Sequence, residues 1–287
     1  MKKILITGKG SYIGTNFKKE LEKYPEKYSV DELDMLDGTW KQHDFSKYDV
    51  VYHVAGLAHS TPNESQRELY YQVNTDLTYE VAVKAKEANV KQFIFMSSII
   101  VYGSGKIGED RIITKDTPLT PDNFYGDSKK QAEIKIKPLD DENFKIVILR
   151  PPMIYGPGSK GNYPLLSKLA RKTPAFPKMQ NKRSMLYLGN LIEFVKLMID
   201  NEEHGIFHPQ NNEYVSSLNL VRTIANLNKH RVYFISAFNP LIRLLNKEKH
   251  INKLFGNLTI DKGLSQYKTN YCKYTFEESI RLTEVLQ

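Results

Sequence analysis

A tyrosine and a lysine lie four residues apart in the segment Tyr125-Gly126-Asp127-Ser128-Lys129. If this segment is helical, the spacing places the two side chains next to each other on one face. A tyrosine hydroxyl has an ordinary pKa of about 10 and is a poor base at neutral pH, whereas a neighbouring cation stabilises the phenolate. The spacing therefore predicts a proton-transferring tyrosine assisted by a lysine. The alternative is an ordinary exposed pair on a helix surface.

A glycine-rich turn follows the apolar run Lys3 to Ile6, at the first expected junction between a strand and a helix. Glycine lets the backbone approach a phosphate, and the N–H groups and positive dipole of a helix start attract an anion. Tight turns also use glycine for conformational reasons alone. At this place in the chain the turn predicts a dinucleotide site formed by Gly8, Gly10, Ser11, Tyr12, Ile13 and Gly14.

The elements around these residues follow a regular alternation. Short β-branched apolar runs alternate with amphipathic stretches throughout the first half, which predicts an α/β fold with a doubly wound parallel sheet. We expect strands at Lys3 to Ile6, Tyr28 to Leu33, Val50 to Val54, Phe93 to Met96 and Lys145 to Leu149, and helices near Ile13 to Lys23, Tyr71 to Ala88 and Tyr125 to Ile136.

The composition changes after Arg150. Prolines and glycines crowd into residues 151–161, a loop-rich composition that indicates a crossover between domains. We therefore expect a dinucleotide-binding domain over residues 1–150, to which later segments return, and a smaller α/β substrate-binding domain over 151–287. Within the latter range, the pattern predicts helices at Asn190 to Asp200 and Leu218 to Leu227.

Composition and charge narrow the class of protein. The chain has 287 residues, 40% of them hydrophobic and 26% charged, as in globular proteins. No apolar run is long enough to cross a bilayer and no signal peptide is evident, so we expect a cytoplasmic protein without an integral membrane segment. The single Cys272 excludes a disulfide framework and a cysteine metal cluster, and we expect no metal. The net charge of +8 is spread along the chain, which argues against nucleic-acid binding and favours an anionic substrate.

The segment Val232 to Phe255 carries apolar side chains among Arg243, Lys247 and Lys249. This pattern is typical either of a helix that faces a core or of a basic amphipathic helix that rests on a membrane. We favour the core-facing interpretation. In either case Asn239-Pro240 interrupts one long helix.

Several motifs together resemble the extended short-chain dehydrogenase/reductase family. The glycine-rich turn is similar to the family's Thr-Gly-x-x-Gly-x-x-Gly, with Gly8 and Gly14 at the outer positions. Ser11 stands where the middle glycine would be, and Gly10 precedes it. The resemblance implies a Rossmann-type fold and a nicotinamide cofactor, while the substitution at Ser11 bears on how closely the pyrophosphate approaches the turn.

The resemblance extends to the catalytic residues. The segment Phe95 to Gly103 is similar to the family's Ser-Ser-x-x-Val-Tyr-Gly strand end, and the matching position makes Ser98, rather than Ser97, the active-site hydroxyl. What the family implies is a hydride exchanged between C4 of the nicotinamide and a carbinol carbon. In that reaction Tyr125 moves the hydroxyl proton, Lys129 lowers its pKa and holds the nicotinamide ribose, and Ser98 orients the oxygen.

The resemblance also implies a set of cofactor contacts. An acidic side chain at the end of the second strand accepts bonds from the adenosine ribose, and Asp31, Glu32 and Asp34 are available. Acidity there favours NAD, whereas Lys9 in the turn suits a 2′-phosphate and keeps NADP open. The other implied contacts are Asp44, Phe45, Val54, Ala55, Gly56, Asn74, Ser97, Tyr125, Lys129 and Pro151.

The second half resembles the segment in which nucleotide-sugar enzymes of this family place an arginine on the substrate diphosphate. Arg183, in the run Lys182 to Leu191, stands at that position, and a guanidinium binds phosphate oxygens bidentately. A surface cation is the alternative. The other substrate contacts that we expect are Asn162, Tyr163 and Phe176, together with Ser98 and Tyr125.

Three reactions of this family remain. The 4,6-dehydratases carry an Asp-Glu pair directly after the active-site hydroxyl, where this chain has Ile99-Ile100, so dehydration is disfavoured. A 4-epimerase oxidises C4 and returns the hydride to the other face, whereas a 4-keto reductase performs only the return. We lead with a UDP-sugar 4-epimerase and keep a UDP-4-keto-6-deoxy-hexose reductase of surface polysaccharide biosynthesis as the alternative. A non-catalytic NAD(P)-binding protein and a membrane-peripheral scaffold come behind both, and homodimer formation is left open.

Overall fold

The computed structural model describes residues 1–58 and 64–285 and divides into two compact units. Unit 1 consists of Met1–Val101, Leu119–Pro151 and Ile192–His208, and unit 2 of Tyr102–Pro118, Pro152–Leu191 and Pro209–Gln287. The chain thus passes between the units several times, and no single boundary near residue 150 separates them. The segment 102–118 groups with unit 2, and the segment 192–208 returns to unit 1.

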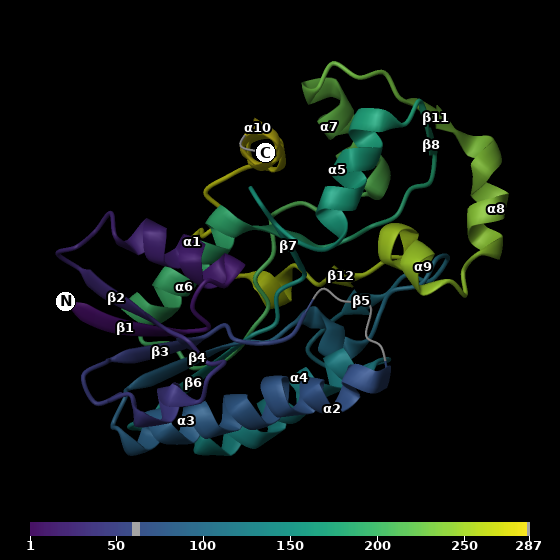
Figure 1. The fold of residues 1–287 in the computed structure, drawn as a ribbon. Helices are drawn as coiled ribbons and strands as arrows, with labels where there is room; N and C mark the ends of the chain where they lie inside the picture. Colours follow the sequence, from purple (N-terminus) through teal and green to yellow (C-terminus); the bar gives the residue numbers. More distant parts are fainter. Residues whose placement is uncertain (59–63, 286–287) are drawn as a thin grey trace. The chain divides into compact units, whose positions relative to one another are not determined.

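Unit 1 is built on a six-stranded sheet in the order β10-β6-β4-β3-β1-β2 (Figure 1). Every neighbouring pair is parallel, and Ile4 of β1 pairs with Val30 on one side and Val50 on the other. The strand order reverses at β1, which confirms the expected Rossmann-type doubly wound sheet. The strands are β1 Lys2–Thr7, β2 Tyr28–Leu33, β3 Val50–His53, β4 Gln92–Met96, β6 Lys145–Leu149 and β10 Gly205–Phe207.

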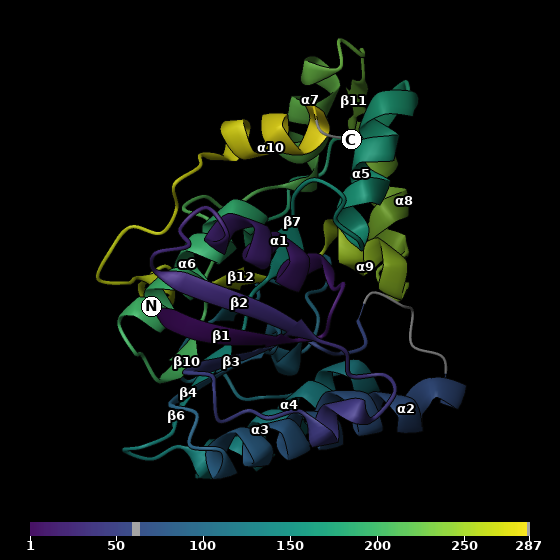
Figure 2. The ribbon, with the colours of Figure 1, turned by 60° about the vertical axis from the view of Figure 1, so that its left-hand side comes forward.

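Helices cover both faces of this sheet. Figures 1 and 2 show α1 and α6 on one face and the layer of α2, α3 and α4 on the other. The helices of this part of the chain are α1 Tyr12–Leu21, α2 Arg67–Tyr71, α3 Leu77–Glu87, α4 Phe124–Ile136 and α6 Leu188–Asp200, with short helical turns at η1 Thr39–Gln42, η2 Glu64–Gln66, η3 Gln72–Asp76, η4 Ile99–Tyr102 and η5 Lys137–Leu139.

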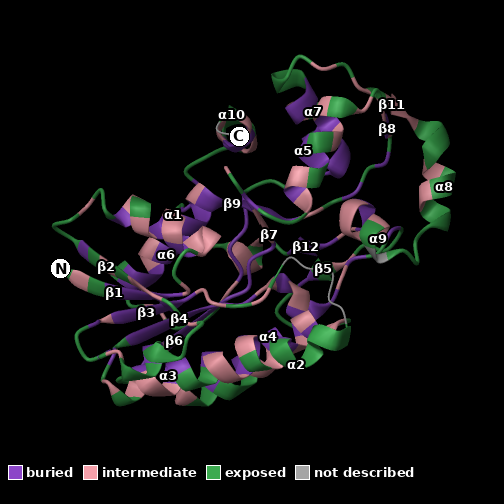
Figure 3. Ribbon diagram, viewed as in Figure 1, coloured by how far each residue is buried: buried purple, intermediate pink, exposed green. Residues whose placement is uncertain are grey.

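The alternation of side chains along each strand explains the two layers. Leu5 of β1 packs in a buried cluster with Val81 of α3 and Ala132 of α4, while its neighbours in sequence point to the opposite face. On that face the ring of Phe17 from α1 meets the ring of Tyr52 from β3 edge-on, with centroids 5.1 Å apart. Figure 3 shows the inner strands of the sheet largely buried, as expected for a sheet covered on both sides. The edge strands β2 and β10 are mostly intermediate or exposed.

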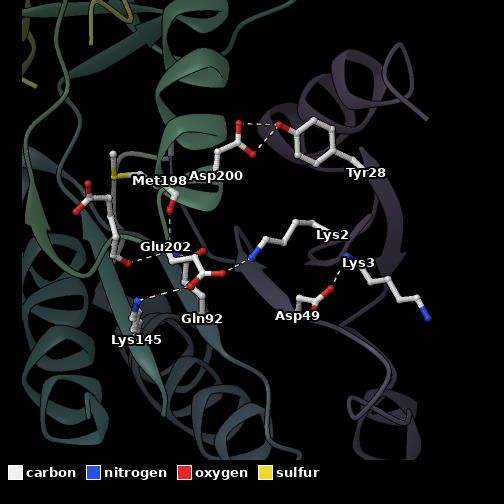
Figure 4. Close-up of polar contacts among 10 residues, drawn as sticks. Lys2, Lys3, Tyr28, Asp49, Gln92, Lys145, Met198, Asp200 and Glu202 are labelled. Atoms are coloured by element: carbon white, nitrogen blue, oxygen red, sulfur yellow. Dashed lines mark hydrogen bonds and ion pairs between the residues drawn. The ribbon is translucent and has the colours of Figure 1, made fainter. Parts of the chain in front are cut away.

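Polar contacts at one end of the sheet explain why residues 192–208 belong to unit 1 (Figure 4). The side chain of Gln92 donates from Nε2 to the backbone oxygens of Met198 and Glu203, at 2.8 Å each. The Tyr28 hydroxyl donates to the carboxylate of Asp200 at 2.7 Å. These bonds tie the C-terminal end of α6 to β2 and β4, far away in sequence.

The expected long helix over Tyr71 to Ala88 is divided. Helix α2 ends at Tyr71, the π-helical turn η3 covers Gln72–Asp76, and α3 begins at Leu77. A π-turn inserts one extra residue and redirects side chains, a local feature that apolar periodicity does not reveal. The expected strands Tyr28 to Leu33 and Lys145 to Leu149 are confirmed to the residue.

Unit 2 contains three short two-stranded sheets, β11-β8, β12-β5 and β7-β9, and a set of helices around an apolar core. Helices α5 and α7 lie side by side. The strands are β5 Ile112–Ile113, β7 Met153–Tyr155, β8 Ala175–Pro177, β9 Met185–Tyr187, β11 Tyr233–Ile235 and β12 Thr259–Ile260, and the helices are α5 Asn162–Lys172, α7 Ser217–Leu227, α8 Asn239–Leu244, α9 Lys249–Phe255 and α10 Phe276–Val285, with turns η6 Ser236–Phe238 and η7 Gly263–Ser265.

The segment from 232 to 255 contacts the core of unit 2 with some of its apolar side chains and leaves others exposed. Phe234, Ile242 and Phe255 pack against the core of unit 2, as the core-facing interpretation expects. Other apolar side chains of α8 remain exposed. Pro240 lies in the first turn of α8, and α8 and α9 are separate helices, so the segment is interrupted as expected. Within residues 1–58 and 64–285, no helix is long and apolar enough to cross a membrane.

Candidate active site

Helix α4 carries both Tyr125 and Lys129, and its first turn is well defined. The Asn123 side chain caps the helix by accepting a hydrogen bond from the backbone N of Gly126 at 2.9 Å. A Cβ atom at Gly126 would lie 2.8 Å from the backbone oxygen of Ile100. Glycine at this position therefore lets α4 approach the segment after β4, which contains Ser98.

The structure brings Ser98 and Tyr125 together. Burial raises the pKa of Tyr125 to about 12, and a side-chain hydrogen bond with Ser98 opposes that rise. The ring of Tyr70 stands edge-on to the Tyr125 ring, with centroids 6.0 Å apart. The pKa of Tyr125 is thus raised, whereas the sequence interpretation expects Lys129 to lower it. Desolvation of the phenolate outweighs the other contributions.

Lys129 is buried, and its ammonium lies at the end of β4. Its Nζ donates to the backbone oxygen of Met96 at 2.9 Å and lies 4.7 Å from the centre of the Phe95 ring. Burial lowers the pKa of Lys129 to about 8, while the charge of Glu133 opposes that shift. A Cβ atom at Gly56 would lie 3.0 Å from Nζ, so only a glycine leaves this space open between β3 and α4.

Glu133 and Arg150 form a buried ion pair that the sequence interpretation did not predict. Arg150 donates from Nη2 to Glu133 Oε2 at 2.5 Å, and the Ser97 hydroxyl donates to Glu133 Oε1. Glu133 lies one helical turn after Lys129 on α4, and this spacing was the feature of the sequence that could have predicted an acidic side chain beside the lysine. Ser97 thus joins the end of β4 to helix α4, in addition to the cofactor contact that is expected of it.

The glycine-rich turn has the backbone that a bound pyrophosphate needs. Gly8 and Gly10 have φ angles of +111° and +74°, a region that favours glycine. A Cβ atom at Gly8 would lie 2.8 Å from the backbone N of Ala55, and one at Gly14 would lie 2.8 Å from the Ile6 side chain. These residues therefore fit a dinucleotide at the first strand-to-helix junction.

Ser11 has a local role that explains its presence in the turn. It is the N-cap of α1, and its side chain accepts a hydrogen bond from the backbone N of Gly14 at 3.2 Å. Tyr12 and Ile13 follow it in the first turn of the helix, where backbone N–H groups lack intrahelical partners. The serine therefore stabilises the helix start at which an anion is expected.

The three acidic candidates for the ribose differ in their surroundings. Asp31 accepts a hydrogen bond from the Tyr48 hydroxyl at 2.7 Å. Glu32 accepts one from the backbone N of Gly10 at 3.4 Å. Asp34 is exposed directly after β2 and accepts a bond from the backbone N of Leu36 at 2.9 Å. Asp31 and Glu32 are thus engaged with other elements, whereas the bond to Asp34 is local.

Three predicted cofactor residues lie before and after β3: Phe45 and Asn74 are buried, whereas Asp44 is exposed. Phe45 is 1% exposed and belongs to the core between the sheet and α3, so its ring is a core element rather than an open adenine contact. Asp44 accepts bonds from the backbone and hydroxyl of Ser46 at 2.9 and 2.7 Å. Asn74 is fully buried, accepts a bond from Leu57 N at 2.8 Å and donates to Ser128 Oγ at 3.0 Å.

The remaining predicted cofactor residues lie along the ends of the strands in unit 1. Val54, Ala55 and Gly56 directly follow β3, and Pro151 follows β6. The backbone N atoms of Val54 and Ala55 both donate to the oxygen of Thr7, at 3.1 and 2.9 Å, which joins this segment to the end of β1.

Two of the predicted substrate residues are buried in the core of unit 2. Tyr163 is fully buried, its ring stacks on Tyr155 at 5.3 Å between centroids, and its hydroxyl donates to Glu284 at 2.8 Å. Phe176 is 3% exposed and packs against Phe255 at 5.6 Å between centroids. Both side chains complete an apolar core instead of lining a substrate site, because the helices of unit 2 close over them.

The other two predicted substrate residues have different placements in unit 2. Asn162 is the first residue of α5. Arg183 donates from Nη1 to the backbone oxygens of Asn252 and Gly256 at 3.4 and 3.2 Å, and burial lowers its pKa to about 10. The cavity beside it measures about 10 Å³, room for about one water. The guanidinium therefore holds the end of α9 in this structure.

A larger hollow of about 370 Å³ opens on the surface of unit 2. It has two cationic side chains, Lys178 and Arg243, and polar ones at Gln180, Asn239 and Asn257. Arg243 and Asn239 belong to α8, so this helix forms one wall of the hollow.

Comparisons with known proteins agree on the family. The family described as "NAD dependent epimerase/dehydratase family" matches residues 4–215. The chain is 31% identical to UDP-glucose 4-epimerase of Vibrio cholerae, an alignment that covers 91% of this chain and 87% of the relative. It is also 31% identical to N-acetyl-alpha-D-glucosaminyl-diphospho-ditrans,octacis-undecaprenol 4-epimerase of Escherichia coli O157:H7, over 70% of this chain and 64% of that protein.

A solved structure shares the fold along almost the whole chain. UDP-glucuronic acid 4-epimerase from Bacillus cereus, in complex with NAD, superposes with a TM-score of 0.76 at 18% identity and covers 99% of this chain and 96% of its own. Together with the parallel sheet, the glycine-rich turn and the meeting of Ser98 with Tyr125, these matches identify the chain as a member of the NAD dependent epimerase/dehydratase family, whose enzymes use a nicotinamide cofactor.

Proposed function

We propose that the protein transfers a hydride at C4 of a UDP sugar and acts as a UDP-sugar 4-epimerase. The observation that carries this proposal is the placement of Ser98 just after β4 and of Tyr125 and Lys129 in the first two turns of α4, all in unit 1. Unit 1 is the proposed NAD(P)-binding domain, and unit 2 is the proposed nucleotide-sugar domain. The similarity to the Vibrio cholerae UDP-glucose 4-epimerase supports the choice of reaction.

The proposed mechanism assigns one task to each side chain. Ser98 holds the sugar oxygen, Tyr125 takes its proton during oxidation and returns it during reduction, and Lys129 supplies the positive charge that stabilises the phenolate. A nicotinamide cofactor held by the glycine-rich turn would supply a reversible hydride acceptor for the C4 carbon. Burial raises the pKa of Tyr125 to about 12, so its hydroxyl is protonated at neutral pH in the protein without cofactor. The oxidation step therefore needs the positive charge of Lys129 to favour the phenolate, whereas the reduction step uses the protonated form directly.

The proposed cofactor is NAD, held by Gly8, Gly10, Ser11, Tyr12, Ile13 and Gly14, with NADP as the alternative. Asp34 is the ribose acceptor that we propose. Its side chain is exposed directly after β2, and its carboxylate accepts a hydrogen bond from the nearby backbone N of Leu36. Arg183 and Asn162 remain the proposed substrate contacts. For Arg183 this requires that the end of α9 releases the guanidinium, because its neighbouring cavity is too small for a phosphate.

The reductase remains the second candidate within this chemistry. Both enzymes need the same three side chains, so their geometry does not separate them. Ile99 and Ile100, at the positions where the dehydratases carry acids, argue against dehydration. The presence of all three catalytic side chains argues against a non-catalytic binding protein.

Substrate turnover distinguishes these candidates directly. The purified protein is incubated with UDP-glucose, UDP-N-acetylglucosamine or a UDP-4-keto-6-deoxy sugar, and the cofactor that co-purifies is identified by absorbance and mass. An epimerase interconverts a UDP sugar with its C4 epimer and retains NAD without net consumption. Consumption of added reduced cofactor by the keto sugar alone would exclude the epimerase, and no turnover of any sugar would favour the non-catalytic alternative.

We further propose a cytoplasmic location and a homodimer. Helices α2, α3 and α4 leave large apolar side chains exposed on one layer of unit 1: Leu69 is 46% exposed, Tyr79 38% and Ile134 52%. Such a group suits a contact between two copies. Light scattering of the unmodified protein and of an Ile134→Glu variant tests the homodimer, because the variant should have half the molar mass of the unmodified dimer.

A further inference from the structure

Helix α8 presents a row of apolar side chains to solvent. Leu241 is 58% exposed and Leu244 79%, and Phe238 and Leu245 are 40% and 36% exposed. The turn η6 leads directly into α8, and apolar residues three to four positions apart lie on one side of such a helical segment. Figure 3 shows α8 as a largely exposed helix. Scattered apolar residues are ordinary on a surface, but four of them along η6, α8 and the residue that follows α8 indicate a binding face.

The opposite side of α8 holds the helix in place. Ile242 packs against the core of unit 2, and Asn239 donates from Nδ2 to the backbone oxygen of Lys178 at 2.9 Å. The exposed row therefore belongs to a helix that is already anchored by its inner side.

Positively charged residues are frequent in the sequence around the row. Arg243 and Lys247 are exposed on α8 and directly after it, and Arg231 stacks over the exposed ring of Tyr233 at 5.4 Å. Lys178 and Arg243 share the hollow beside α8. Between residues 229 and 255, Glu248 is the one acidic residue in the sequence, against Lys229, Arg231, Arg243, Lys247, Lys249 and Lys253.

We propose that the row of Phe238, Leu241, Leu244 and Leu245 docks unit 2 onto the surface of an anionic lipid bilayer. Exposed apolar side chains beside lysine and arginine are what such a surface binds, since the chains enter the interface and the cations meet phosphate headgroups. A second copy of the same face fits less well, because its cations would repel. This docking is independent of the reaction proposed above.

Vesicle flotation tests the docking. The full chain is mixed with vesicles of phosphatidylcholine alone or of phosphatidylcholine and phosphatidylglycerol in equal parts. We expect binding to the anionic vesicles, and binding weaker by about tenfold or more for Leu241→Gln/Leu244→Gln. Leu36→Gln is the matched control, because Leu36 is a 94% exposed leucine in unit 1 and its variant should bind as the unmodified chain does.

A fluorescent variant reports insertion separately from adhesion by charge. In Leu244→Trp, the new indole should shift its emission to shorter wavelength on anionic vesicles and keep that shift at high salt, whereas Leu36→Trp should not shift. Thermal melts check that each variant is folded. Substitutions at these exposed positions should leave the fold intact. The proposal is overturned if the unmodified chain does not float, if Leu241→Gln/Leu244→Gln floats equally well, or if that double variant instead converts a dimer into a monomer.

Discussion

Glu133 and Arg150 form an ion pair that is almost closed to solvent, with 2.5 Å between Glu133 Oε2 and Arg150 Nη2. The Glu133 side chain is 5% exposed and that of Arg150 8%. The same carboxylate accepts a hydrogen bond from Ser97, next to the proposed catalytic Ser98. Its negative charge opposes the lowering of the Lys129 pKa that burial causes. The pair thus links the end of β6 to the two elements that carry the proposed catalytic residues.

Removing one partner of this pair should be strongly destabilising. Glu133→Ala leaves the Arg150 guanidinium buried without its counter-charge, and such a loss costs about 3–5 kcal/mol. Glu133→Leu combined with Arg150→Met should recover much of that stability, since no buried charge remains. Urea unfolding of the single and double variants checks this. Equal stability losses in both would show that packing, rather than charge, is what the pair contributes.

Tyr125→Phe should remove turnover without removing the cofactor site. The hydroxyl is the group that moves the proton, and losing such a group costs about 10²–10⁴-fold in rate. Steady-state kinetics on a confirmed UDP-sugar substrate measures the loss, and cofactor retention by the purified variant serves as the control. Full turnover in a folded, cofactor-bound variant would reject Tyr125 as the acid and base.

Lys129→Met should stabilise the free protein at neutral pH while abolishing activity. Burial lowers the pKa of Lys129 to about 8 from an ordinary 10.5, so folding disfavours its protonated form. The cost is fully present below pH 8 and disappears between pH 8 and 10.5, because in that window only the unfolded chain keeps the proton.

Thermal melts across this window measure the effect. The advantage of Lys129→Met over the unmodified protein should shrink as pH rises from 8 to 10.5. Lys130→Met is the matched control, since Lys130 is the next residue on α4 and is only partly buried. A stability difference that does not change with pH would contradict the assignment to Lys129.

The two glycines with positive φ in the first turn should respond differently to alanine. Both substitutions strain the backbone, but only Gly8→Ala also drives a Cβ to within 2.8 Å of the Ala55 backbone, while a Cβ at Gly10 meets nothing within 4 Å. Gly10→Ala should cost about 1–2 kcal/mol of stability, and Gly8→Ala clearly more. Urea unfolding gives the stabilities, and NAD binding by calorimetry should follow the same order. If Gly10→Ala lost more stability than Gly8→Ala, backbone strain rather than the contact with Ala55 would dominate at this turn.

Local patterns in the sequence were sufficient to predict five of the six strands in the sheet of unit 1, while β10 was missed, and they indicate a dinucleotide site at the first turn. The apolar runs of β2 and β6, the glycines at 8 and 14 and the four-residue spacing of Tyr125 and Lys129 depend on neighbours along the chain. Strand pleating, turn geometry and helix pitch operate over these short distances, so the residues alone reveal them.

The tertiary structure decided what depends on burial and on partners far away in sequence. It placed Tyr163 and Phe176 in a core, paired Glu133 with Arg150, returned residues 192–208 to unit 1 and raised the pKa of Tyr125. Desolvation and packing depend on every element that closes around a group, and no local motif specifies them. The same reason applies to residues 232–255, where the sequence favours a core-facing segment over a membrane-resting one, whereas the leucines that α8 leaves exposed are evident only from the fold.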